Sequence, residues 1–517
     1  MEAKKSLKML TLCQKIWPGL LLTVIFFVLY LWGMKFYVDN SQFNSPDESA
    51  NYYFLQNLTQ TGQIPVAQSE GMTDIVHPRS ILVWQNKLVP ISFPGLIYVL
   101  APFYWLGGLW GVFVFYGILF VFFLYLLWRW IQRENLPKYL WWIAALQPAL
   151  WYYLFHPLFN SVLSFLLGFS ALFLLTEKSR FARYGGVFAL SVALWVRPFD
   201  LVYLGPILLL GAIYYQVKWR RALSYLAFIG GGALLFFGLS NYAVYGHPCL
   251  FGYTLPKPTN VGGEQVLDYW RSVKLFLKNT WYFIGQLFWP YFAGAALGVG
   301  AYLWTWRRSE KIYHFLMACL LFGGGALILF YGFGDLNDHV VKNNISIGGA
   351  FARYWLPIYF LMTVPLVYFF EKLKVSACRC RTLLLVSVLA IFAVYAVWCR
   401  NNDSLIQERQ NLAAGIVEKN ILQKIIPDNV ILVLDREDKY FFPERTVIHL
   451  SEFQDDYALA GIGDLLRAGQ SVYYYGFTLG EIDWNYLHQK KLDPLSLRLN
   501  HLLDGEEKSL YQFELYE

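Results

Sequence analysis

The chain has 517 residues and a mass of 60.0 kDa, and its composition excludes most classes of soluble protein. Hydrophobic residues make up 57% and charged residues only 15%, whereas a typical soluble chain has about 25% charged residues. A soluble core cannot bury that much apolar surface, so we expect lipid to surround most of the chain. This composition also excludes intrinsic disorder, and six cysteines are too few for a disulfide framework.

The net charge of +7 is an average over two regions of opposite charge. Residues 1–400 hold 31 Lys and Arg and 15 Asp and Glu, a net charge of +16, whereas residues 401–517 hold 11 and 20, a net charge of −9. We therefore expect a transmembrane domain over residues 1–400 and a soluble domain over residues 401–517. The acidic tail has no basic face with interleaved aromatic residues, so we expect no nucleic-acid partner.

Apolar segments long enough to cross a bilayer alternate with clusters of Lys and Arg, which collect in cytoplasmic loops. Together they predict an all-α polytopic membrane protein with about eleven transmembrane helices, a cytoplasmic N-terminus and an extracytoplasmic tail. The predicted spans are about 16–38, 108–130, 138–156, 158–176, 184–198, 201–216, 222–245, 281–306, 312–334, 351–371 and 381–400. The basic clusters include Lys178/Arg180/Arg183, Lys218/Arg220/Arg221 and Arg307/Arg308/Lys311.

Two apolar stretches need separate treatment because they contain proline. The segment 89–106 has three prolines, and a crossing there would place every later basic loop outside the cell. We expect this segment to be re-entrant or to lie along the membrane surface. The stretch 184–216 has basic residues at both ends, so we expect two short crossings that are broken at Arg197-Pro198.

The tail has the pattern of a small α/β domain on the extracytoplasmic side. Alternating elements of this kind are typical of α/β units. The predicted helices are 403–426 and 456–468, and the predicted strands are 430–434, 446–448 and 471–475.

The first outer loop, residues 39–88, carries an acidic pair, Asp47-Glu48, at the start of a predicted helix. Apolar residues follow at helical spacing, so we expect an amphipathic helix that lies on the membrane. An acid held at the lipid boundary tends to have a raised pKa, and such a carboxylate could take a proton from an incoming hydroxyl. The alternative is a plain helix cap at Asp47 with a first-turn acid at Glu48.

Cations in the expected outer loops are the second group of candidates. His77, Arg79 and Lys87 lie in the first outer loop, where they either meet a lipid phosphate or are ordinary interfacial charges. Arg197 interrupts an apolar run, and a charge at membrane depth costs about 2.5–3.5 kcal/mol, so it is a functional candidate by default. A structural pair with Asp200 is the alternative.

Further candidates lie at other corners on the same side of the membrane. Arg353 and Tyr354 open a late helix at its outer end, after a polar loop that contains His339. His156 and Asn160 form a polar corner between two predicted helices. A snorkelling arginine and a buried histidine with satisfied hydrogen bonds are the structural alternatives.

Three features in this order resemble the GT-C superfamily of polytopic glycosyltransferases. More narrowly, they look like the branch that contains the protein O-mannosyltransferases and the lipid A aminoarabinose transferases. They are Pro46-Asp47-Glu48 with Tyr52, Leu58 and Gly62 behind it, the pattern from Asn160 to Arg197-Pro198, and Arg353-Tyr354-x-Leu356-Pro357. The resemblance covers about residues 10–400. Ser92-Phe93-Pro94-Gly95 stands where the aminoarabinose transferases have a Lys-Pro-Pro turn, which argues against that particular substrate.

The resemblance implies an inverting transfer of a sugar from a polyprenyl-phosphate donor to a hydroxyl on a glycan, lipid or protein. Asp47 would be the general base, with Glu48 beside it as the second catalytic acid. The implied phosphate-binding residues are Arg353, Arg197, Lys87, Arg79 and His77, and those at the acceptor or cavity are His156, Asn160, Tyr354 and His339. The resemblance also implies a bacterial inner or plasma membrane. The family has metal-dependent and metal-independent branches. Because only Asp47 and Glu48 look like ligands here, we favour no metal over a divalent metal, and we expect no other cofactor.

Two other classes of function remain open. A transporter or flippase of lipid-linked sugars would carry charges near the midplane and paired repeats. The candidate charges here lie at the outer ends of helices, and no internal repeat stands out. The other alternative is a non-catalytic membrane scaffold.

Overall fold

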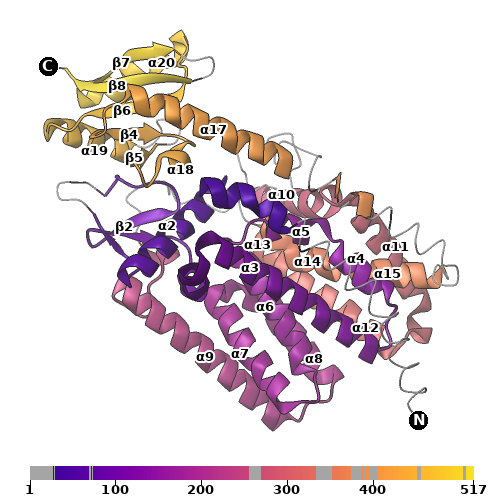
Figure 1. Ribbon diagram of the computed structural model, residues 1–517. Helices are drawn as coiled ribbons and strands as arrows, with labels where there is room; N and C mark the ends of the chain where they lie inside the picture. Colours follow the sequence, from indigo (N-terminus) through magenta and orange to yellow (C-terminus); the bar gives the residue numbers. More distant parts are fainter. Residues whose placement is uncertain are drawn as a thin grey trace.

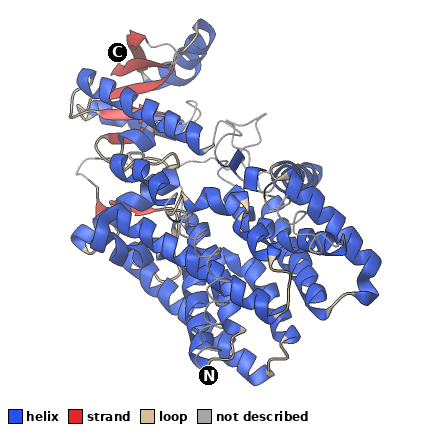
Figure 2. Ribbon diagram, turned by 45° about the vertical axis from the view of Figure 1, so that its right-hand side comes forward, coloured by secondary structure: helices blue, strands red, loops and turns tan. Residues whose placement is uncertain are grey.

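The computed structural model describes residues 30–68, 74–255, 269–333, 352–373, 404–450, 456–504 and 508–516, and isolated positions at 27, 72, 387, 390–392, 394, 395 and 397. Within this part of the chain it has eighteen α-helices and eight strands. A large helical body is joined to a smaller unit that carries the C-terminus (Figure 1). Figure 2 shows that most strands lie in this C-terminal unit.

The helical body is built from short and long helices that follow one another along the chain. Residues 30–40 are helical. The helices that follow are α2 (Pro46–Thr61), α3 (Gly95–Arg133), α4 (Tyr139–Ala145), α5 (Pro148–Leu154), α6 (Asn160–Leu175), α7 (Arg180–Val196), α8 (Leu201–Tyr214), α9 (Trp219–Tyr245), α10 (Tyr269–Thr280), α11 (Trp289–Thr305), α12 (Lys311–Ala318), α13 (Gly325–Gly332), α14 (Leu356–Leu361) and α15 (Thr363–Lys372).

Four stretches of the described residues are helices long and apolar enough to cross a membrane. They are α3, α9, the stretch Lys311–Gly332 that joins α12 to α13, and the stretch Ala352–Lys372 that contains α14 and α15. The bent pair of α7 and α8 makes a fifth if it counts as one span. Apolar side chains are also exposed on α8 and α9. Together with the long apolar helices, they indicate an integral membrane protein.

The bend between α7 and α8 confirms the predicted break at Arg197-Pro198. The two helices are inclined by 120°, with a 3₁₀ turn over Pro198–Asp200 between them. The expected span 138–156, by contrast, is not one helix, because Pro148 starts a new helix and separates α4 from α5. Most of the predicted spans 16–38 and 381–400 lies outside the described residues.

The segment 89–106 is neither a simple span nor a surface helix along its whole length. It begins in a strand, and residues 95–106 form the first part of α3. The chain then reverses at Gly107 and Gly108, which have non-helical backbone angles, with φ +58° at Gly108. Phe103 and Phe115 therefore stack across the break, with ring centroids 3.9 Å apart. The reversal divides the 39 residues of α3 into a short arm and one span.

The first outer loop forms α2 and a small antiparallel sheet of β1 (Val66–Ala67), β3 (Lys87–Pro90) and β2 (Ile81–Trp84), in that order. The expectation of an amphipathic helix on the membrane surface is wrong for α2. Its polar Glu48 and Asn51 are as buried as its apolar Phe54. The helix packs against α3 on one side and the C-terminal unit on the other, where the rings of Tyr53 and Phe442 lie 4.6 Å apart.

The C-terminal unit is a mixed α/β structure, as the sequence predicted. Its elements are α17 (Leu405–Ile425), β4 (Ile431–Leu434), α18 (Asp438–Phe441), β5 (Thr446–His449), α19 (Asp456–Arg467), β6 (Val472–Phe477), α20 (Glu481–Leu487), β7 (Leu497–Asp504) and β8 (Lys508–Leu515). The strand order is β5-β4-β6-β8-β7, with β4 parallel to β5 and β6, and β8 antiparallel to β6 and β7. The predicted helices and strands are all present, and the hairpin of β7 and β8 was not predicted.

The first outer loop contributes to the core of the C-terminal unit. Ile75 and Val76 belong to the same buried cluster as Ile431 and Val433 of β4 and Ile448 of β5. The backbone N–H of His449, the last residue of β5, donates to the carbonyl of His77 at 3.2 Å. The C-terminal unit therefore takes part of its core from a segment more than 300 residues earlier in the chain.

Candidate functional site

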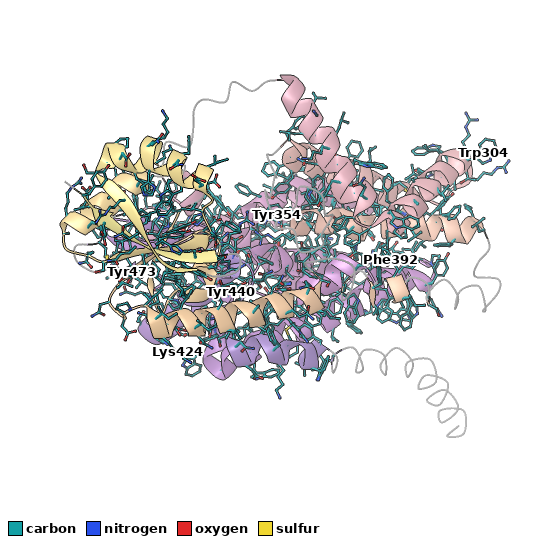
Figure 3. All side chains as sticks on the ribbon, turned by 90° about the horizontal axis from the view of Figure 1, so that it is seen from above. Trp304, Tyr354, Phe392, Lys424, Tyr440 and Tyr473 are labelled. Atoms are coloured by element: carbon teal, nitrogen blue, oxygen red, sulfur yellow. The ribbon has the colours of Figure 1, made fainter. Side chains whose placement is uncertain are left out.

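A polar cavity of about 170 Å³ lies where α2, the start of α6, the α7–α8 bend, α13 and the stretch before α14 meet. Figure 3 places Tyr354, one of its lining residues, between the C-terminal unit with Tyr473 and the far end of the body at Trp304. The lining residues are Asp47, Asn51, Ser92, Phe93, Phe159, Asn160, Ser161, Arg197, Phe199, Tyr253, Tyr331, Arg353 and Tyr354. Five of the residues predicted from the sequence are thus together in one cavity.

Asp47 and Arg353 form an ion pair at this cavity, although 306 residues separate them in the chain. Asp47 is in the first turn of α2, and Arg353 is in the 3₁₀ turn that precedes α14. The other oxygen of Asp47 accepts a hydrogen bond from Ser80 Oγ. The side chain of Asp47 is 34% exposed and that of Arg353 only 7%, so the carboxylate faces the cavity while the cation is fixed behind it.

These partners set the charge of Asp47. Burial alone would raise its pKa, but the charge of Arg353 and the hydrogen bond from Ser80 outweigh burial and lower the pKa below its usual range. Asp47 is therefore ionised at neutral pH. A ligand that draws Arg353 away would remove the largest of these stabilising charges and raise the basicity of the carboxylate.

The two buried arginines of the cavity are held over aromatic rings. The Arg353 guanidinium lies 4.0 Å from the centroid of Phe159, and that of Arg197 lies 4.6 Å from the centroid of Tyr354. Arg197 also donates to Tyr331 Oη at 2.7 Å and contacts the Asp200 carboxylate at 3.1 Å, so the predicted structural pair is present. In the described part of the chain, Arg353 Nη1 is buried and has no hydrogen-bond partner.

Amide side chains fix the helices around the cavity. Asn51 of α2 donates to the carbonyl of Leu158 at 2.8 Å and accepts from Ser92 Oγ at 2.8 Å. Asn160, the first residue of α6, donates to the carbonyls of Phe93 and Val196 at 3.0 and 3.1 Å. Asn160 therefore joins the turn before α3 to the end of α7, and it lines the cavity.

Glu48 lies apart from the cavity that Asp47 lines, which argues against the expectation that it acts beside Asp47. Its side chain is 1% exposed, and its Oε2 is 3.0 Å from His156 Nδ1. The other nitrogen of His156 is 3.2 Å from Glu408 Oε2 of α17, which is fully buried. One histidine between two buried carboxylates therefore joins α2 and the α5–α6 turn to the C-terminal unit; we name Glu48, His156 and Glu408 the buried triad.

Burial and charge act in opposite directions within the buried triad. Burial raises the pKa of Glu48 above its usual range, although His156 opposes this. Burial would lower the pKa of His156, but the two carboxylates outweigh it and raise the pKa to about 10. His156 lies between α5 and α6, outside the candidate spans. It is therefore a charged structural residue at neutral pH, so its predicted place at the acceptor cavity is not observed.

The remaining predicted phosphate-binding residues lie away from the cavity. Arg79 binds Asp438 with two nitrogens, at 2.6 and 3.0 Å, and donates to the carbonyl of Arg436 at 2.8 Å. His77 lies at the edge of the C-terminal unit, where burial lowers its pKa, and Lys87 is exposed on β3. These three residues lie in the segment 39–88 but do not line the cavity. His339 lies outside the described residues.

Several residues of the site were not predicted from the sequence. Ser80 and Tyr253 come from loops with no distinctive pattern, and Tyr331 is one of 37 tyrosines in the chain. Glu408 is one of many acids in the tail, and only its position on the buried side of α17 gives it a role. No local spacing connects any of them to Asp47 or His156.

Among the described residues, no group of three or more His, Cys, Asp or Glu has the arrangement of a metal site. The site is thus a pair of buried arginines beside one ionised carboxylate, within an aromatic wall. Comparison with known proteins finds no matching family model, no matching curated protein and no matching solved structure.

Proposed function

We propose that this chain is an inverting glycosyltransferase that moves a sugar from a polyprenyl-phosphate donor to a hydroxyl acceptor. The observation that carries the proposal is the meeting of Asp47 and Arg353 at one cavity, with Arg197 in the same wall. A base next to fixed cations is what transfer from a phosphate-linked donor requires. The base takes the acceptor proton, and the cations stabilise the leaving phosphate.

In the proposed step the acceptor oxygen attacks the anomeric carbon from the side opposite the phosphate, so the configuration inverts. The new C–O bond forms as the bond from the anomeric carbon to the phosphate oxygen breaks. The acceptor proton goes to the Asp47 carboxylate, and the polyprenyl phosphate leaves with the bonding electron pair. Arg353 then stabilises the negative charge that develops on the phosphate, and its Nη1, which has no partner among the described residues, provides a donor for it.

Donor binding would also activate the base. In the structure the same guanidinium of Arg353 binds Asp47 and holds the pKa of this carboxylate low. When a phosphate binds Arg353, it competes with Asp47 for that cation. The pKa of Asp47 then rises, and an oxygen of its carboxylate becomes free to accept the proton of the acceptor hydroxyl. The basicity of Asp47 would therefore depend on whether a donor phosphate occupies the site.

The topology that we propose places this cavity on the extracytoplasmic side of a bacterial inner or plasma membrane. The basic clusters between the helices would face the cytoplasm, and the C-terminal unit would cover the outer face. The eleven spans expected from the sequence belong to this proposal. The arginines of the cavity would then lie at the depth of a lipid phosphate, with the donor tail in the bilayer.

The test is sugar transfer by the purified full chain in detergent, with a polyprenyl-phosphate sugar as donor. Asp47→Asn keeps the size of the side chain but removes the base, so the rate should fall by about 10²- to 10⁴-fold. The matched control is Asp39→Asn, because Asp39 is exposed at the end of the helix 30–40, outside the cavity, and its variant should keep the wild-type rate.

Two outcomes would contradict the proposal. Full activity of the Asp47→Asn variant would remove Asp47 as the base. If the wild-type chain transferred no sugar but moved lipid-linked sugars across vesicle membranes, the protein would be a transporter.

A further inference from the structure

A second, larger cavity of about 640 Å³ lies between α3, α6, α8, α9 and α12. It is at the opposite end of α6 from the polar cavity. Asn160 begins α6 at the polar cavity, whereas Leu175 ends this helix at the larger one. We name it the apolar cavity, because its walls are leucine, isoleucine and phenylalanine side chains such as Leu127, Phe169 and Ile229. Ligand cavities in proteins typically measure about 300–1,000 Å³, so this one is large enough for a ligand.

Part of the wall of the apolar cavity is exposed at the surface of the helical body. Leu201 and Leu209 of α8 and Leu226 of α9 line it, and their exposed fractions are 54%, 64% and 53%. In a chain whose outer helices face lipid, such an exposed wall meets acyl chains and not water. An acyl chain can therefore enter without crossing a polar surface.

One end of the apolar cavity has a rim of four cations. Lys178 and Arg183 come from the turn after α6 and the start of α7, and Lys218 and Arg221 come from the N-cap and the first turn of α9. Within the described residues, no ion pair engages any of the four. The only acid of the rim, Glu177, already binds Arg129 at 3.3 Å.

The rim also has a buried donor without a partner. In the part of the chain that the structure describes, Nε of Arg183 is shielded from solvent and makes no hydrogen bond. An unpaired buried donor costs free energy, so a ligand oxygen placed there would be stabilised. The rim cations belong to two of the basic clusters that the sequence analysis assigns to the cytoplasm.

We propose that the apolar cavity binds an anionic glycerophospholipid of the cytoplasmic leaflet. Its acyl chains would lie along the apolar wall and meet the surrounding lipid at the exposed part of this wall. Its phosphate would lie among the four rim cations, with Nε of Arg183 as one donor. Basic pockets between membrane helices on the cytoplasmic side are suited to anionic headgroups. This lipid site is separate from the polar cavity, and it does not depend on the proposed glycosyl transfer.

Retention of lipid by the purified full chain tests the proposal, with native mass spectrometry as the readout. The probes are phosphatidylglycerol and phosphatidylcholine with identical acyl chains, and we expect the chain to retain phosphatidylglycerol preferentially. Lys218→Gln/Arg221→Gln should weaken phosphatidylglycerol binding by about five-fold for each cation removed. The matched control is Arg307→Gln/Arg308→Gln, because these cations do not line the cavity; it should leave binding unchanged.

A second variant fills the cavity without changing its charge. Gly211 lines the cavity, and a Cβ placed on it would have no neighbour within 4 Å, so we expect the side chain of Gly211→Phe to occupy the space of an acyl chain. Gly300→Phe is its control, because Gly300 is equally unhindered and lies on α11, away from the cavity. We expect lipid loss only in the first variant.

Three results would overturn the proposal. The first is equal retention of the two lipids by the wild-type chain. The second is unchanged phosphatidylglycerol binding in both Gly211→Phe and Lys218→Gln/Arg221→Gln. The third is displacement of phosphatidylglycerol by a polyprenyl phosphate at equal concentration, since the cavity would then belong to the donor.

Discussion

Replacing His156 with alanine should release α17 from the helical body. His156 is the only cation of the buried triad, and Glu48 and Glu408 are 1% and 0% exposed. Without the imidazolium, two carboxylates would lie in a site that water does not reach. They would either take up protons or separate, and separation means that α17 moves away from the helical body at His156.

Two arguments give the same magnitude. Removing one partner of a buried ion pair typically costs about 3–5 kcal/mol, because the other charge stays buried without compensation. A pKa of His156 raised from 6.5 to about 10 corresponds to roughly 5 kcal/mol in favour of the charged form. We therefore expect the free energy that holds α17 in place to fall by about 3–5 kcal/mol, or about 10²- to 10⁴-fold in the opening equilibrium.

Hydrogen–deuterium exchange of the amides of α17, on the full chain in detergent, measures this equilibrium directly. His247→Ala is the matched control, because His247 is exposed in a loop and its variant should exchange like wild type. Adding Glu48→Gln and Glu408→Gln to His156→Ala removes all three charges and should restore most of the protection. Wild-type exchange rates in the His156→Ala variant would refute the reasoning. If the amides of α17 exchanged as fast in the triple variant as in His156→Ala, the effect would come from lost packing and not from charge.

The buried triad also makes the docking of α17 depend on pH. The pKa of His156 is higher in the folded chain than in the unfolded one. Its stabilising contribution is therefore complete below about pH 6.5 and is lost as the pH rises toward 10. The groups that face it are the carboxylates of Glu48 and Glu408 and the rings of Tyr37 and Tyr152. Protection of α17 should fall over this range in wild type and not in His156→Ala.

Two further predictions concern the first outer loop. Ser80→Ala removes a hydrogen bond that lowers the pKa of Asp47. The acidic limb of the pH–rate profile for sugar transfer should therefore move up by about one pH unit. An acidic limb at the wild-type pH would contradict this role of Ser80. Burial would raise the pKa of Asp438, but the charge of Arg79 outweighs burial and lowers this pKa below 3.8. The stability that the ion pair contributes is therefore present above pH 3.8 and is lost as the pH falls further. Arg79→Ala should therefore lower the free energy that holds the C-terminal unit in place at neutral pH by about 3 kcal/mol. Limited proteolysis would detect this as faster cleavage. Equal cleavage of the variant and the wild type would argue against this anchor.

The parts of the structure that the sequence predicts well are those set by local pattern. A proline after a charged residue in an apolar run predicted the break between α7 and α8, and the alternation of apolar runs and turns predicted β4, β5 and β6. The hairpin of β7 and β8 escaped prediction because its strands are rich in polar residues, such as Asn500 and Gln512, that face each other across the sheet.

The site was predicted where chemistry alone identifies a residue. A charge that interrupts an apolar run is costly wherever it stands, so Arg197 could be singled out without knowing its neighbours. The different surroundings of Asp47 and Glu48 could not be predicted in this way. Asp47 and Glu48 are adjacent in sequence, but successive residues of a helix point about 100° apart, so one faces the cavity and the other faces His156. Arg79 likewise had a suitable charge, and its partner Asp438 is 359 residues away.

The contact between the first outer loop and the C-terminal unit has a consequence for the order in which the protein is assembled. Arg79 leaves the ribosome 359 residues before Asp438, which at about 5–20 residues per second is a delay of roughly 20–70 s. During that interval Ile75 and Val76 have no core to enter, and Glu48 and His156 lack their third partner. A nascent chain released early would therefore expose apolar loop surface and an incomplete triad, which quality-control proteases could recognise. Folding of the segment that carries Asp47 is complete only when the last hundred residues have been made and have folded.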